Sequence, residues 1–124
     1  MMSEKTEKIV YISTNGGENP EKATLPFVLA NAALTMDVEA IVALQGPAVT
    51  LAKGDCLQHV FAAGLPPLQD LVKSFMEQGG RLMVCVPCIR ERKIDEADLI
   101  EGSEPMAAAK LTQEILSADA TLVY

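Results

Sequence analysis

The fold is decided by the stretch Gly79-Gly80-Arg81-Leu82-Met83-Val84-Cys85-Val86-Pro87. It contains, in direct succession, the end of a helix, a buried strand and the start of a helix. The two glycines end a segment, Pro67 to Gln78, whose apolar residues recur at helical spacing. From Arg81 to Val86 the chain is almost continuously apolar, which is typical of a strand buried on both faces. Because Pro87 favours the first turn of a helix, the stretch predicts the helix–strand–helix unit of an α/β fold.

Strands and helices alternate on both sides of this stretch. Ile9-Val10-Tyr11-Ile12 is another continuous apolar run, and Asn19 before Pro20 is a typical helix start. The alternation predicts a mainly parallel sheet with helices on both faces. Periodicity does not decide between a strand and an irregular segment for residues 56–61. The predicted strands cover residues 8–14, 38–44, 81–86 and 120–124, and the predicted helices cover 20–36, a short segment from Pro47 to about Lys53, 67–78, and a last one from Glu104 or Pro105 to about Ser117.

Length and composition predict one globular domain over residues 1–124. Of the 124 residues, 49% are hydrophobic, which is enough for one aliphatic core. The net charge of −7 argues against a nucleic-acid partner and against anionic membranes. The polar start, residues 1–8, has no signal-peptide run, and no stretch reaches the length of a membrane span. We therefore expect a cytoplasmic protein.

Three cysteines in a cytosolic chain are candidates for chemistry, metal binding or packing rather than for structural disulfides. Cys85 lies where a predicted buried strand ends and a helical turn begins. Unpaired amides at a helix start stabilise an anion, so we predict a lowered pKa and a nucleophilic thiolate for Cys85. Arg90 and Arg92 follow closely and add positive charge that favours the thiolate.

Cys88 lies one helical turn after Cys85 and completes a Cys-x-x-Cys motif. The motif fits a dithiol redox pair, a sulfur carrier with a neighbouring thiol, or half of a zinc site. In the zinc alternative, Cys56 and His59 supply the second pair of ligands. We favour a thiol site without metal or cofactor.

Three predicted loops lie at the carboxyl ends of strands, where ligands collect in parallel sheets. They are Asn15 to Asn19, Gln45-Gly46, and the turn at Cys85. Asn15-Gly16-Gly17 is a candidate cradle for an anion, although it lacks a nucleotide-binding fingerprint. We therefore add Asn15 and Gly16 to the candidate binding residues.

Taken in order along nearly the whole chain, several motifs resemble the DsrE/DsrF-like family, which includes small intracellular sulfur-relay proteins. Two departures from the family pattern are Arg92-Lys93-Ile94, where Arg-Gly-Ile is frequent, and Asp37, where a glycine usually precedes the second strand. The resemblance is carried by Ile9-Val10-Tyr11-Ile12-Ser13-Thr14-Asn15-Gly16, Gly64-Leu65-Pro66-Pro67-Leu68, Gly79-Gly80, Val84-Cys85-Val86-Pro87-Cys88-Ile89-Arg90 and the segment from Ile94 to Gly102.

The resemblance implies a three-layer α/β/α sandwich with a sheet of about five strands, and assembly into dimers, trimers or hexamers. It also implies that Cys85 stands where sulfurtransferases of the family carry a persulfide, and that Cys88 matches a second cysteine of some branches. On this basis we expect a sulfur carrier or sulfurtransferase that meets donor and acceptor proteins. The alternative is a non-catalytic oligomeric binding or regulatory protein in which Cys85 and Cys88 sense the redox state.

Overall fold

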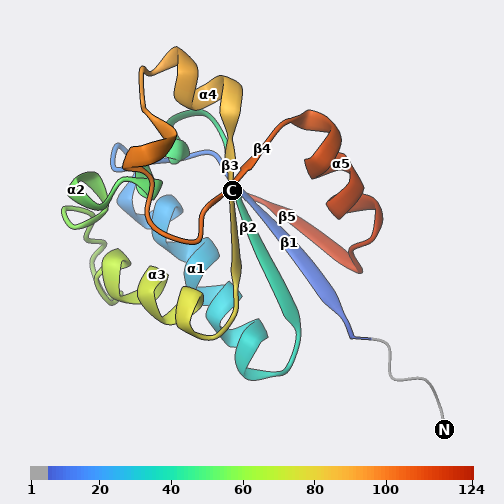
Figure 1. Ribbon diagram of the computed structural model, residues 1–124. Coiled ribbons are helices and arrows are strands. Elements are labelled where there is room, and N and C mark those ends of the chain that lie inside the picture. The colour runs from blue at the N-terminus through green and yellow to red at the C-terminus, as the bar shows by residue number, and fades with distance from the viewer. Residues whose placement is uncertain (1–5) are drawn as a thin grey trace, which may run out of the picture.

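The computed structural model describes residues 6–124 (Figure 1). Residues 1–5, which hold most of the polar start considered above, lie outside the described residues. Within residues 6–124, no helix is long and apolar enough to cross a membrane. In chain order the elements are β1 (Lys8–Ser13), α1 (Pro20–Thr35), β2 (Glu39–Leu44), the 3-10 helix η1 (Gly46–Ala52), α2 (Gly54–Leu57), α3 (Leu68–Glu77), β3 (Arg81–Cys85), α4 (Val86–Glu91), the 3-10 turn η2 (Glu96–Asp98), β4 (Glu104–Met106), α5 (Ala108–Leu116) and β5 (Ala120–Val123).

The five strands form one sheet in the order β4-β3-β2-β1-β5, and every neighbouring pair is parallel. Val10 lies beside Ile41, and Ile41 in turn lies beside Arg81. Because all strands run the same way, their carboxyl ends share one edge of the sheet. The predicted parallel sheet is confirmed, and its carboxyl edge is where the candidate loops meet.

Helices cover both faces of the sheet, as the predicted three-layer sandwich requires (Figure 1). On one face, α1 and α3 pack over the larger core, where the fully buried rings of Phe27 and Phe75 meet edge to face at 5.6 Å. On the other face, α5 covers a smaller core that includes Met83 and Leu111. The sheet therefore has two apolar faces, which explains why its strands read as continuous apolar runs.

The structure corrects one sequence expectation about the elements and decides a second point that the sequence left open. The last helix begins at Ala108 rather than at Glu104 or Pro105, because residues 104–106 form the edge strand β4 beside β3. Proline is tolerated in an edge strand, where its missing N–H faces away from the neighbouring strand. Residues 56–61 are not a strand, since the helical turn α2 ends at Leu57 and a turn follows. The fifth strand is thus β4.

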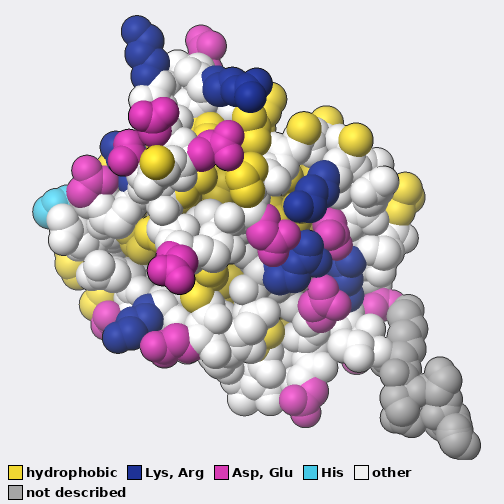
Figure 2. Space-filling model, viewed as in Figure 1, with side chains coloured by type: hydrophobic (Ala, Val, Ile, Leu, Met, Phe, Trp, Pro, Cys, Tyr) yellow, Lys and Arg dark blue, Asp and Glu magenta, His cyan; other side chains and the backbone are white. Residues whose placement is uncertain are grey.

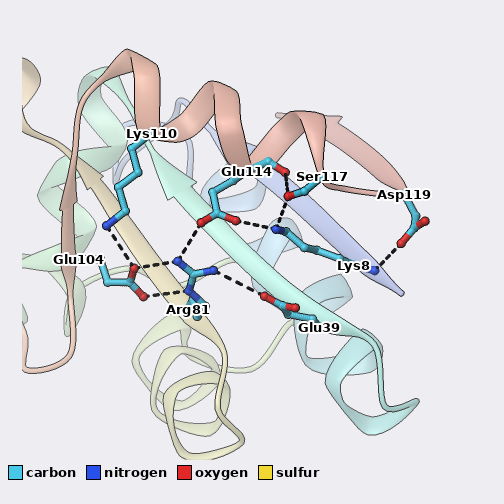
Figure 3. A network of polar contacts seen from close by, with 8 residues as sticks. All are labelled: Lys8, Glu39, Arg81, Glu104, Lys110, Glu114, Ser117 and Asp119. Carbon is cyan, nitrogen blue, oxygen red and sulfur yellow. Dashed lines mark hydrogen bonds and ion pairs between the residues drawn. The ribbon is translucent and has the colours of Figure 1, made fainter. Parts of the chain in front are cut away.

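Charged side chains gather over the sheet beside α5 (Figure 2), and they form one connected network (Figure 3). Arg81 lies 3.0 Å from Glu104, 3.0 Å from Glu114 and 3.5 Å from Glu39. The ammonium of Lys8 lies 2.6 Å from Glu114, whose side chain is only 16% exposed. Glu114 of α5 therefore joins the first residues of two strands, which fixes the helix over the amino-terminal end of the sheet.

The network predicts an acid-sensitive contribution to stability. Hydrogen bonds from Lys8 hold the pKa of Glu114 below its ordinary value of 4.5, and Arg81 lowers the pKa of Glu104 in the same way. A carboxylate with a lowered folded pKa stabilises the fold above its ordinary pKa, and this stabilisation is lost as the pH falls through the folded pKa. We expect Glu114→Gln to lower the free energy of unfolding by about 1–3 kcal/mol at neutral pH. The difference from wild type should shrink below pH 4.5.

Urea unfolding at neutral and acidic pH measures this difference. Glu77→Gln is the matched control, since Glu77 is exposed on α3, and it should change the stability by less than about 0.5 kcal/mol. Equal stability of Glu114→Gln and wild type at neutral pH would show that the network does not stabilise the fold.

Candidate functional site

Two thiols meet at the carboxyl end of β3. Cys85 is the last residue of β3 and caps α4, and Cys88 lies on the first turn of that helix. The two Sγ atoms are 2.7 Å apart, within hydrogen-bond distance, and both side chains are half-buried. The predicted turn from strand to helix is therefore present, and it brings the two sulfur atoms of the motif into direct contact. We call Cys85 and Cys88 the thiol pair.

The backbone of η1 forms one side of the thiol pair. The amide N–H of Gly46 donates to Cys88 Sγ at 3.3 Å. Gly46 has a φ of +55°, a left-handed conformation that glycine adopts readily, and this turn directs the amide at the sulfur. The contact therefore holds Cys88 Sγ in a fixed position against η1.

Burial opposes the expected activation of Cys85. Burial raises the pKa of the Cys85 thiol above its ordinary value of 9.0, and the hydrogen bond with the Cys88 thiol raises it further. The backbone of Cys88 and the charge of Arg92 act in the opposite direction, but they are weaker. The prediction of a lowered pKa at Cys85 is therefore wrong, because the end of β3 is packed between the two cores of the protein.

Of the two predicted arginines, the structure places Arg92 close to the thiol pair. Its guanidinium donates to the carbonyl oxygen of Cys88 at 3.2 Å. Arg90 lies exposed on α4. Basic and acidic side chains stand together at the tip of the molecule formed by α4 and the residues that follow it (Figure 2). The arginines thus provide positive charge around α4, with Arg92 nearer to the sulfur atoms.

Gly16 packs closely against η1, the segment whose first residue contacts the thiol pair. A Cβ atom at Gly16 would lie 2.6 Å from the carbonyl oxygen of Pro47 and 2.8 Å from Thr50 Oγ1, so only glycine allows this approach. The Gly16 amide itself donates to Glu18 at 2.9 Å. Gly16 therefore seats the β1–α1 loop against η1, whose first residue contacts Cys88.

Asn15 lies in the same loop. The side-chain amide nitrogen of Asn15, Nδ2, is 3.5 Å from Thr14 Oγ1. The structure thus places Asn15 at the carboxyl edge of the sheet, and the contact it shows there is with Thr14 rather than with the thiol pair.

The residues of the zinc alternative do not come together. Cys56 lies in α2, and His59 is exposed in the turn that follows. Among residues 6–124, no group of three or more His, Cys, Asp or Glu side chains is arranged to hold a metal ion. The thiol pair is therefore separate from Cys56 and His59.

Sequence reasoning placed the loop Gln45-Gly46 at the correct edge but assigned it no role. The contact that matters is a backbone amide, which leaves no side-chain signal in the sequence. The three loops lie at the carboxyl ends of their strands as predicted, and they also contact one another, since Gly16 lies against Pro47 and Gly46 donates to Cys88.

Comparisons with known proteins identify relatives of the chain. The model of the DsrE/DsrF-like family matches residues 7–124. The uncharacterized protein MJ0760 of Methanocaldococcus jannaschii is 35% identical over 101 residues, which cover 81% of this chain and 36% of that protein. The chain thus spans about a third of the length of the curated relative that it matches.

Solved structures share the fold. The crystal structure of the ychN protein from E. coli has a TM-score of 0.80 and 24% identity, covering 96% of this chain and 100% of that one. The structure of MTH1491, a protein of unknown function from Methanobacterium thermoautotrophicum, has a TM-score of 0.74 and 14% identity, covering 97% and 100% of the two chains. At these identities the likeness concerns the fold.

Proposed function

The chain belongs to the DsrE/DsrF-like family, and from this premise we propose that it is a sulfur carrier or sulfurtransferase whose Cys85 holds sulfur as a persulfide. Membership of the family suggests a role related to sulfur relay. The observation that carries the finer proposal is the thiol pair, with 2.7 Å between its sulfur atoms at the carboxyl edge of the sheet. Sulfur enters when the Cys85 thiolate attacks a sulfane donor, because the thiolate is the nucleophilic form.

Cys88 and its surroundings support this assignment. The terminal sulfur of a persulfide carries negative charge readily. The Gly46 amide donates to Cys88 Sγ, and the Arg92 guanidinium donates to the Cys88 carbonyl oxygen. Positively charged groups and hydrogen-bond donors stabilise such an anion. The site needs no metal or cofactor for this chemistry.

We further propose that donor and acceptor proteins approach the exposed α4. Arg90 at the end of α4, and Arg92 and Lys93 directly after it, are exposed on a chain with a net charge of −7, and the acidic Glu91 is exposed among them. A local basic surface attracts an acidic partner and orients it toward the thiol pair. Self-association belongs to the same proposal, and it is supported by exposed apolar side chains on α1 and directly after it, where Leu29 is 42% and Met36 73% exposed.

Intact-mass spectrometry after incubation with inorganic polysulfide tests the carrier role. The loaded protein should gain about 32 Da, the mass of one sulfur atom, with the added sulfur in the peptide that contains Cys85. We expect Cys85→Ser to lose this adduct, because serine provides no sulfur nucleophile. Cys56→Ser is the matched control and should load like wild type, since Cys56 lies in α2 away from the thiol pair. An adduct that persists in Cys85→Ser would contradict the assignment.

The second candidate function is a redox-sensitive binding or regulatory protein. The direct contact between the two sulfur atoms favours it as well, since neighbouring thiols oxidise readily to a disulfide. In that case oxidation would change assembly or partner affinity, and polysulfide would leave no transferable sulfur on the protein. Gel filtration of the reduced and oxidised protein, combined with the mass measurement, distinguishes the two functions.

A further inference from the structure

We propose that the thiol pair also releases its sulfur as hydrogen sulfide, because Cys88 attacks the persulfide held on Cys85. This inference rests on the proposed function and adds a second activity to it. The site would then be a persulfide-reducing centre that turns sulfane sulfur into sulfide and becomes a Cys85–Cys88 disulfide. Its substrate class is sulfane sulfur bound to a donor thiol or to a polysulfide.

The first support is the position of the attacking sulfur. Cys88 Sγ lies 2.7 Å from Cys85 Sγ, the atom that it must attack. Cys88 is held there by α4, whose first turn begins directly after Cys85. An attacking group fixed this close reacts as though it were present at very high concentration. A persulfide on Cys85 therefore forms beside its own reductant.

The second support is the environment of Cys88. The Gly46 amide donates to Cys88 Sγ at 3.3 Å, and the Arg92 guanidinium donates to the Cys88 carbonyl at 3.2 Å. The first contact holds the Cys88 sulfur in place, and the second holds the backbone that carries it. The structure therefore positions Cys88 Sγ for attack on Cys85 Sγ, and the attacking species is the thiolate, as in any thiol exchange.

The step balances in atoms and electrons. A bond forms between Cys88 Sγ and Cys85 Sγ, and the bond between Cys85 Sγ and the terminal sulfur breaks. The terminal sulfur leaves with the electron pair of the broken bond and with its hydrogen, as HS⁻. The two cysteine sulfurs are oxidised to a disulfide, and the sulfane sulfur is reduced to sulfide. An external dithiol must reduce the disulfide before a second turnover, so one loading without reductant releases at most one sulfide per chain.

Single-turnover loading tests the inference on the full chain. Wild type, Cys88→Ser and Cys56→Ser are reduced, desalted and treated with a brief pulse of inorganic polysulfide. Excess donor is then removed by a second desalting step. Released sulfide is trapped with a bimane reagent and quantified over time, while intact mass is followed in the same samples. Cys56→Ser controls for the loss of a cysteine outside the thiol pair.

We expect wild type and Cys56→Ser to release sulfide about 100-fold faster than Cys88→Ser, because only they have the neighbouring thiol. Their adduct of about 32 Da should be transient, and as sulfide is released their mass should fall to about 2 Da below that of the reduced chain, as a disulfide requires. Cys88→Ser should keep an adduct of about 32 Da. A stable adduct on wild type would overturn the sulfide release and leave the carrier role intact. Absence of an adduct on Cys88→Ser would overturn the carrier role itself, and the inference with it.

Discussion

Alkylation of Cys85 by iodoacetamide should accelerate about tenfold per pH unit between about pH 7 and pH 9, without reaching a plateau in that range. Burial raises the pKa of the Cys85 thiol above its ordinary value of 9.0, and the Cys88 thiol raises it further. Only the thiolate reacts, so its fraction at neutral pH is small and grows with each unit of pH up to the raised pKa. Over the two units the rate should rise about 100-fold.

Peptide mapping by mass spectrometry measures this rate at each pH. Trypsin cleavage after Arg81 and Arg90 places both sulfurs of the thiol pair in one peptide, and fragment ions separate Cys85 from Cys88. The control is the chain unfolded in urea, where burial is lost and the rate should level off near the ordinary thiol pKa of 9.0. A plateau for the folded chain below about pH 8 would show a lowered pKa and would contradict the structure.

A raised pKa at Cys85 has a consequence for sulfur loading. A thiol that is mostly protonated at neutral pH reacts slowly with stray oxidants and electrophiles. Under the proposed function, loading would then be fastest where a partner protein brings the sulfane donor directly to the site. The proposed docking surface is the end of α4 and the residues directly after it, where Arg90, Arg92 and Lys93 are exposed.

The strands of the sheet could be predicted because burial on both faces leaves a direct pattern. Ile9 to Ile12 and Leu82 to Val84 are continuous apolar runs, and each lies within a central strand. The strand β4 was missed because it leaves no such apolar run. It has only three residues, and Pro105 within it favours a helix start as strongly as an edge strand. Its identity as a strand depends on β3 lying beside it.

The position of the thiol pair could also be predicted, but its electrostatics could not. The sequence shows that Cys85 ends a strand and that a helix follows. It does not show that the end of β3 is packed between two cores, which reverses the expected direction of the pKa shift. The contact of Gly46 with Cys88 depends on a left-handed turn 42 residues earlier in the chain. Nor does the sequence predict the ion-pair network of Lys8, Arg81 and Glu114.

The stability of the larger core depends strongly on the ring of Phe75. Phe75 is fully buried in α3 and meets Phe27 of α1 edge to face at 5.6 Å. The ring also lies directly against Gly80, where an added Cβ atom would sit within 2.3 Å of it. We therefore expect Phe75→Ala to lower the free energy of unfolding by about 3–5 kcal/mol, through lost burial and the cavity left behind.

Phe61→Ala is the matched control, because Phe61 is 61% exposed and the substitution is the same. It should change the free energy of unfolding by less than about 0.5 kcal/mol in urea titrations. Since β3 starts directly after Gly80 and ends at Cys85, a loosened core also loosens the strand that positions the thiol pair. Phe75→Ala should therefore increase alkylation of Cys85 at neutral pH, whereas Phe61→Ala should not. Equal unfolding free energies for the two variants would mean that the α1–α3 layer does not hold the sheet.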